Sequence, residues 1–187
     1  MDNDPIVLAH ATSLLAGSPQ GATQYIDGDL RDASVMLRAA AGTLDFTRPV
    51  ALMLVGILHL IQDSEEPHRI VASLMDALPS GSYLAISHPA SDINAGQAEA
   101  QRRYNERVRT PQTLRTRDEV TRFFEGLDLV PPGVVYVYAW RPDPGDAPPE
   151  GGVSAYAAWH ARPDAPARTS LDIKIYQAYG FRMQRIA

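Results

Sequence analysis

The chain has 187 residues, of which 45% are hydrophobic and 21% are charged, with 17 basic and 22 acidic residues. This size suits one globular domain, and the negative balance argues against a nucleic-acid binder that neutralises phosphates. No cysteine occurs, which excludes disulfides, zinc–thiolate sites and cysteine nucleophiles. The longest apolar run, from Val50 to Ile61, is well short of the ~20 residues of a membrane span. We therefore predict a cytoplasmic protein that binds neither nucleic acid nor membranes.

The first third of the chain predicts two helices separated by a short strand. Asp4 and Pro5 suit the cap and the first position of a helix that ends before Gly17. A short strand is expected over 22–26, and a second helix over 33–41.

The central part of the chain alternates strands with helices. The run 50–55 is apolar without alternation, which is typical of a strand buried on both faces of a parallel sheet. An amphipathic helix over 67–78 leads to a second buried strand over 82–87, and a polar, arginine-rich helix follows over 94–107. We predict that the two strands are adjacent and parallel, with the helix as their right-handed crossover.

The last part of the chain begins with a capping box at 116–119 that opens a helix reaching Leu127. The alternating segment 134–140 predicts an antiparallel strand, 141–152 a loop, and 153–159 a last strand. A weakly helical stretch over 170–186 closes the chain. Together these elements predict an α/β fold with a doubly wound, mostly parallel sheet and an appended antiparallel strand.

Candidate ligand contacts follow the strand 50–55, because doubly wound sheets bind ligands at the carboxyl ends of their strands. Gly56 would allow close approach of the backbone, and His59 lies one helical turn further on. His59 and His88 each suit two interpretations, a packed core histidine or a residue that contacts a ligand. The arginines at 102, 103, 107, 109, 115 and 117 form either an anion-steering cluster or, in the interpretation we favour, a solvated helix face. No phosphate loop, metal-ligand histidine spacing or nucleophile elbow is present.

Four stretches of the sequence together carry a resemblance to a known family. They are DNDPIVLAHA at 2–11, YIDGDLRD at 25–32, the segment 48–59 that begins RPVAL, and ALPSGSYLA at 77–85, with weaker similarity at 122–127 and 140–143. In their order and spacing they resemble the actinobacterial S-adenosyl methyltransferase family, which has a class I, Rossmann-like methyltransferase fold. The resemblance implies S-adenosylmethionine as cofactor and a small molecule as methyl acceptor.

The same resemblance implies roles for individual residues. Asp2 would accept hydrogen bonds from the cofactor's ribose hydroxyls, and Asp29 from its adenine amino group, while the backbone amide of Leu30 meets a ring nitrogen. With Gly56 and His59 they make up the predicted cofactor site, and no general base is assigned. On residue pattern alone, Asp2 caps the first helix, as Asp4 does, and Asp29 belongs to an ordinary Asp-Gly-Asp turn.

The family's first strand, its glycine-rich cofactor turn and most of its second strand have no counterpart in this sequence. We therefore expect a fold that lacks these parts, through an internal start codon or a decayed gene, with a methyltransferase-like domain over 1–160 and a divergent tail over 161–187. The exposed edge of strand 50–55 would then favour a homo-oligomer. Two alternatives to an active enzyme are a non-catalytic remnant that pairs with another chain and an unrelated nucleotide-binding module.

Overall fold

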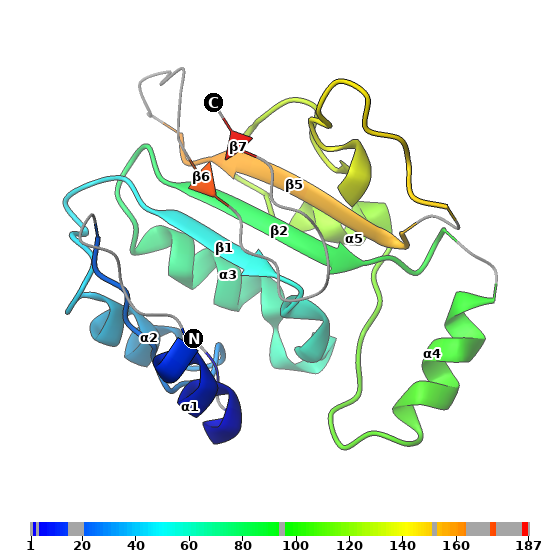
Figure 1. Ribbon diagram of the computed structural model, residues 1–187, viewed down its shortest axis with the longest axis horizontal. Coiled ribbons are helices and arrows are strands. Elements are labelled where there is room, and N and C mark those ends of the chain that lie inside the picture. The colour runs from blue at the N-terminus through cyan, green and yellow to red at the C-terminus, as the bar shows by residue number, and fades with distance from the viewer. Residues whose placement is uncertain are drawn as a thin grey trace.

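Figure 1 shows the computed structural model, which describes residues 2, 4–14, 21–93, 96–150, 153–163, 173–174 and 185–186. The helices are α1 (Pro5–Leu14), α2 (Ala33–Ala40), α3 (Pro67–Asp76), α4 (Gln97–Asn105) and α5 (Arg117–Arg122). The strands are β1 (Ala51–Val55), β2 (Tyr83–Pro89), β3 (Asp128–Leu129), β4 (Val135–Tyr136), β5 (Ala155–Ala161), β6 (Ile173–Lys174) and β7 (Arg185–Ile186). Short 3-10 turns lie at η1 (Leu58–Leu60), η2 (Asp63–Glu65) and η3 (Val137–Ala139).

The main sheet has the strand order β1-β2-β5-β3, and β4 also pairs with β5. β1 and β2 are parallel, from Ala51 opposite Tyr83 to Val55 opposite Ser87. β5 runs antiparallel to β2, β3 and β4, so it alone reverses direction among the strands of this sheet. The predicted α/β class is confirmed, and so is the pairing of two adjacent parallel strands that are connected through α3.

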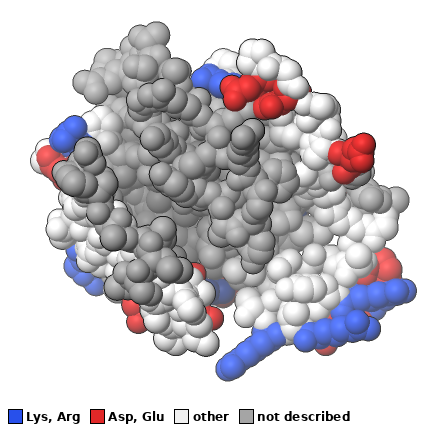
Figure 2. All heavy atoms as spheres, in the orientation of Figure 1, with Lys and Arg blue, Asp and Glu red and all other residues white. Residues whose placement is uncertain are grey.

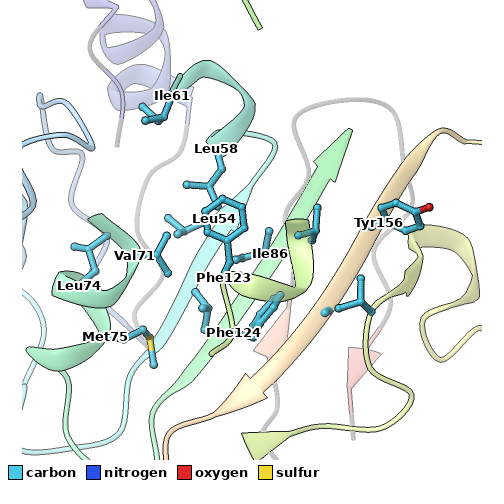
Figure 3. Packing of buried hydrophobic residues seen from close by; sticks show 14 of the residues in the cluster. Leu54, Leu58, Ile61, Val71, Leu74, Met75, Ile86, Phe123, Phe124 and Tyr156 are labelled. Atoms are coloured by element: carbon cyan, nitrogen blue, oxygen red, sulfur yellow. The ribbon is translucent and has the colours of Figure 1, made fainter. Parts of the chain in front are cut away.

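Helices α3 and α5 cover one face of the sheet and build the core (Figure 3). Leu54 of β1 and Ile86 of β2 are each 2% exposed, and Val71 of α3 and Phe123 after α5 pack over them. Burial of each such side chain contributes about 1.5–3 kcal/mol. The predicted start of α5 is confirmed by a reciprocal capping box at Thr116. This core fixes where the carboxyl ends of β1 and β2 lie.

The structure corrects two strand predictions. Segment 22–26 forms no strand in the structure. Asp27, the next residue, makes a single parallel bridge with Asp2, and no other described residue pairs with this segment. The predicted strand over 134–140 is reduced to Val135–Tyr136, after which the chain turns into η3. There the Tyr136 and Tyr138 rings stack with centroids 5.5 Å apart, so the alternation in the sequence reflects ring packing as well as a strand. The antiparallel strand inside the sheet is β5.

The ends of the chain differ in how well they were predicted. The first helix is confirmed as α1, although its predicted stop at Gly17 lies outside the described residues. The helix expected over 170–186 is wrong where the structure describes it, because β6 and β7 pair there as antiparallel strands. The rest of that segment lies outside the described residues. Among the described strands β1 pairs only with β2, and an oligomer through this edge stays a prediction.

Candidate functional site

The backbone at the end of β1 is open to close approach. Gly56 has φ +60°, and a Cβ placed there would meet no atom within 4 Å. Its amide donates to the carbonyl and to the hydroxyl of Ser87, both at 3.1 Å, which fixes the peptide against the end of β2. A left-handed glycine with free space beside it suits contact between backbone and ligand.

His59 sits in η1, the turn that follows Gly56. Its carbonyl accepts from the Thr113 amide at 2.8 Å, and its ring lies edge-to-face with His88 at a centroid distance of 6.3 Å. Burial, followed by the positive charge of Arg115, lowers the pKa of His59, so the ring is neutral near pH 7. Its Nδ1 is buried and finds no hydrogen-bond partner in the described part of the chain. A buried polar atom of this kind requires a partner, such as water or a ligand.

Arg115 fixes the turn that carries His59 from beneath. The residue is 2% exposed, and its Nη1 donates to the Leu58 carbonyl at 3.0 Å and to His88 Nε2 at 2.8 Å. Its Nη2 donates to the Ile61 carbonyl at 3.0 Å and to Asp63 Oδ1 at 2.6 Å. One buried guanidinium thereby joins the turn after β1 to the end of β2.

His88 serves this arrangement as an acceptor. Because a guanidinium only donates, Nε2 of His88 must accept from Arg115, and Nδ1 carries the proton that is donated to the Pro89 carbonyl at 2.8 Å. Burial lowers the pKa of His88 to about 4, so the ring is neutral near pH 7. Both ring nitrogens are engaged, which makes His88 a packed core residue.

Asp2 and Asp27 bring the amino-terminal segment to the Asp-Gly-Asp turn. The Asp2 amide donates to the Ile26 carbonyl at 3.2 Å, and the Gly28 amide donates to the Asp2 carbonyl at 3.1 Å. The Asp2 carboxylate accepts from the Asp4 amide at 2.9 Å, and that of Asp4 accepts from the Ile6 amide at 2.8 Å. Asp4 is thus the helix cap that the sequence predicted, and the ribose contact of Asp2 stays a prediction.

Arg31 connects the Asp29 turn to the turn after β1. Its Nη1 donates to both carboxylate oxygens of Asp29 at 3.0 Å, and the Arg31 amide donates to Asp29 Oδ1 at 2.9 Å. The same guanidinium binds Glu65 at 2.6 Å and the Leu60 carbonyl at 3.2 Å. The hydrogen bond between Arg31 and Glu65 raises the pKa of Arg31 and lowers the pKa of Glu65. The Leu30 side chain is buried in the core, so its backbone amide is the group left for a ligand contact.

The sequence profile of the S-adenosyl methyltransferase family matches residues 1–164. The chain belongs to this family. A solved protein of Streptomyces avermitilis described as a DUF574 family protein is 41% identical, with a TM-score of 0.79 over 87% of this chain and 63% of its own length. A candidate methyltransferase of Thermobifida fusca is 35% identical, with a TM-score of 0.74 over 86% of this chain and 61% of its own. The chain thus spans less than two thirds of both solved relatives.

More distant comparisons add the fold alone. The crystal structure of TnmH has a TM-score of 0.52 at 16% identity, over 86% of this chain and 41% of that protein. No curated protein matches the chain. Within the described ranges, no helix combines the length and apolar character that crossing a membrane requires. The cytoplasmic location stays a prediction.

Two arginines of the site were missed by sequence reasoning. Arg31 lies inside a family-like stretch, but an exposed arginine two residues after an aspartate gives no signal of its longer-range contacts. The sequence prediction assigned Arg115 to an arginine cluster on a solvated helix face, and the structure corrects this assignment. The Arg115 side chain is buried, and two carbonyls, an imidazole and a carboxylate accept its hydrogen bonds. The solvated interpretation is confirmed for Arg102 and Arg103, which are exposed and paired with carboxylates.

Proposed function

We propose that this chain binds S-adenosylmethionine at the carboxyl ends of β1 and β2 and takes part in transferring the cofactor's methyl group to a small molecule. The observation that carries the proposal is the Arg31 network. The network joins the Asp29 turn to the turn that contains Gly56 and His59. Predicted cofactor residues from separate segments therefore lie together at the carboxyl ends of the strands. The family that the chain belongs to supports the same cofactor.

The residues present fit this cofactor in their donor and acceptor chemistry. The carboxylates of Asp2 and Asp29 offer only acceptors, which suits ribose hydroxyls and an adenine amino group. Gly56 offers an open backbone, and the orphaned Nδ1 of His59 lies in the turn beside it.

The bound cofactor would supply a methyl group on a positively charged sulfur, which a nucleophile on the acceptor attacks in line. The chain's own contribution is then orientation, because holding two reactants in line removes much of the entropic part of the barrier. Arg115 contributes by fixing the carbonyls of Leu58 and Ile61, which sets the shape of the turn that holds Gly56 and His59. Its role is positioning, since it is buried beneath the turn.

A titration followed by amide NMR tests this proposal. S-adenosylmethionine should shift the amides of Leu30, Gly56 and His59 in a saturable way. Because no glycine-rich cofactor turn is present in this sequence, we expect a dissociation constant of about 0.1 mM or weaker. Loss of one hydrogen bond to a charged group costs ~1.5–3 kcal/mol, so Asp29→Ala should weaken binding roughly tenfold or more.

Asp76→Ala is the matched control, since Asp76 is an exposed carboxylate at the far end of α3. It should leave the affinity unchanged. If millimolar S-adenosylmethionine shifts none of the three amides, or if Asp29→Ala and Asp76→Ala behave alike, the proposed site is wrong.

A further inference from the structure

A groove of about 550 Å³ lies against α4, which Figure 1 shows at the lower right, across the picture from α1 and α2 at the lower left. Its lining includes Ser91 just after β2, Gln101 and Asn105 of α4, and Leu114. The volume is in the range of sites that hold small molecules. The predicted cofactor residues line none of it, so the groove is a separate space.

The walls of the groove are fixed to each other by side-chain amides. Asn105 Nδ2 donates to the Gln112 carbonyl at 2.8 Å, and the Gln112 amide donates back to Asn105 Oδ1 at 2.9 Å. Gln101 Nε2 donates to Asn105 Oδ1 at 2.8 Å. These reciprocal bonds hold the polar helix α4 against the extended segment 112–115, although Figure 1 shows that α4 projects from the body of the fold.

The same extended segment connects the groove to the proposed cofactor edge. The Thr113 amide donates to the His59 carbonyl at 2.8 Å, and the Ser91 amide donates to the Arg115 carbonyl at 3.0 Å. The Thr113 hydroxyl also binds the Gln62 side chain at 3.0 Å. The segment that lines the groove at Leu114 is therefore bonded to the turn after β1, so it connects the groove to the proposed cofactor site.

Charge on α4 is balanced within the helix. Arg102 binds Glu99 at 2.8 Å and Glu106 at 2.6 Å, and Arg103 binds Glu99 at 2.7 Å. Basic side chains gather at the lower right of Figure 2, where α4 lies, and acidic atoms are visible beside them. The groove consequently offers a ligand the Ser91 hydroxyl and the Gln101 side-chain carbonyl oxygen, next to the apolar Ala98 and Leu114. The Asn105 amide and Gln101 Nε2 are already bonded to each other and to Gln112.

We propose that this groove binds the methyl acceptor, and that the acceptor is an uncharged small molecule with hydroxyl or amide groups on an apolar frame. The inference rests on the proposed function, because it assigns the second substrate of the same reaction. The hydroxyl and amide groups of the acceptor match Ser91 and Gln101, and the apolar frame matches Leu114. An anionic acceptor would gain little from Arg102, which is already paired with Glu99 and Glu106.

The test uses the whole chain and a matched pair of probes, neutral 4-hydroxybenzamide and anionic 4-hydroxybenzoate. In amide NMR titrations the neutral probe should shift Ser91, Gln101 and Leu114, and the anionic probe should bind at least threefold more weakly. Ala98→Trp fills the groove from an exposed helix position and should weaken the neutral probe at least tenfold. Ala100→Trp, also exposed on α4 but outside the groove lining, is the control and should change its affinity less than twofold.

The two proposals fail in different ways. Absence of groove shifts with both probes, equal binding of the two probes, or equal effects of the two tryptophan variants would overturn the acceptor assignment. A parallel titration of Ala98→Trp with S-adenosylmethionine should still shift Gly56, which supports a groove separate from the cofactor site. If that titration shifts no site amide in either the variant or the unaltered chain while the groove still binds the neutral probe, the proposed function fails and the groove is a binding site of another kind.

Discussion

Two arginines at opposite ends of the same sheet show how differently a buried guanidinium can be used. At the amino end of β2, Arg162 donates through Nη1 to the carbonyls of Met75 and Leu78 at the end of α3. At the carboxyl end, Arg115 donates to the carbonyls of Leu58 and Ile61 as well as to His88 and Asp63. Arg162 is half-buried, whereas Arg115 is 2% exposed.

The difference lies in what each arginine holds. The last carbonyls of any helix lack partners inside it, so a cation there performs an ordinary capping task and also meets the negative end of the helix dipole. The carbonyls held by Arg115 lie in the short 3-10 turn η1 beyond β1 and at its C-cap, and the turn's own backbone hydrogen bonds run from Leu60 to Ile57 and from Ile61 to Leu58. We infer that Arg162 serves stability alone, whereas Arg115 serves both stability and the geometry of the proposed cofactor edge.

The largest effect should come from Arg115→Met. It removes the donor that His88 and the Ile61 carbonyl share in a buried place and leaves the Leu58 carbonyl with the Ile61 amide alone. We expect a loss of about 3–5 kcal/mol in the free energy of unfolding. Urea unfolding measures this loss, with Arg102→Met as the exposed control that should cost under about 1 kcal/mol. If Arg115→Met loses as little stability as the control, Arg115 does not have the structural role that we assign to it.

Acidification should destabilise the chain through two buried histidines. Burial lowers the pKa of both His88 and His160 to about 4, against an ordinary value near 6.5. Below pH 6.5 the unfolded chain therefore binds protons that the folded chain does not, so stability falls as the pH drops from 6.5 towards 4. Each histidine can contribute about 2–3 kcal/mol to this fall.

His160→Phe isolates one of the two contributions. The His160 ring stacks on Phe124 at a centroid distance of 4.0 Å, and its buried Nδ1 has no hydrogen-bond partner in the described ranges, so phenylalanine fits the same packing without a titrating group. Urea unfolding of both proteins at pH 7 and pH 4.5 should show a shallower pH dependence for the variant. Identical slopes would mean that His160 does not titrate as its burial requires.

Arg162→Met should have a smaller effect than Arg115→Met. Its hydrogen bonds are only partly buried, so water can replace part of what the guanidinium supplies, and we expect a loss of about 1–2 kcal/mol in urea unfolding. The histidine ring signals of His59 and His88 in NMR spectra should not move, because the change lies at the other end of the sheet. Movement of these signals would show that the two ends are coupled and that the arginines do not have separate roles.

An effect on stability as small as that of Arg162→Met should come from Gly56→Ala. A residue with a Cβ at φ +60° is strained by about 1–2 kcal/mol, although space for the methyl group is present. Gly126→Ala is the matched control, because Gly126 has φ +79° and is equally open. The two variants should lose similar stability, and only Gly56→Ala should weaken the binding of S-adenosylmethionine in the NMR titration. Equal binding by both would remove Gly56 from the site.

The features that the sequence predicts are those that depend on residues close to one another along the chain. β1 was predictable as a strand because its apolar run is unbroken, although only Leu54 of its five residues is buried. α5 was predictable because its capping box lies within four residues. Segment 134–140 was predicted less well, since its alternation is compatible with stacked rings on a turn. Arg31 and Arg115 could not be recognised as site residues, because their long-range partners lie 27 to 57 residues away and contribute mostly backbone carbonyls and carboxylates.

A crystal structure of this chain soaked with S-adenosylhomocysteine, the demethylated product of the cofactor, would test the account most directly. We predict density at the carboxyl ends of β1 and β2, with the adenine near Asp29 and Leu30, backbone contact at Gly56, and the groove beside α4 left empty. Density in that groove, density at the amino end of the sheet near Arg162, or no density at millimolar ligand would contradict the assignment of this edge as the cofactor site.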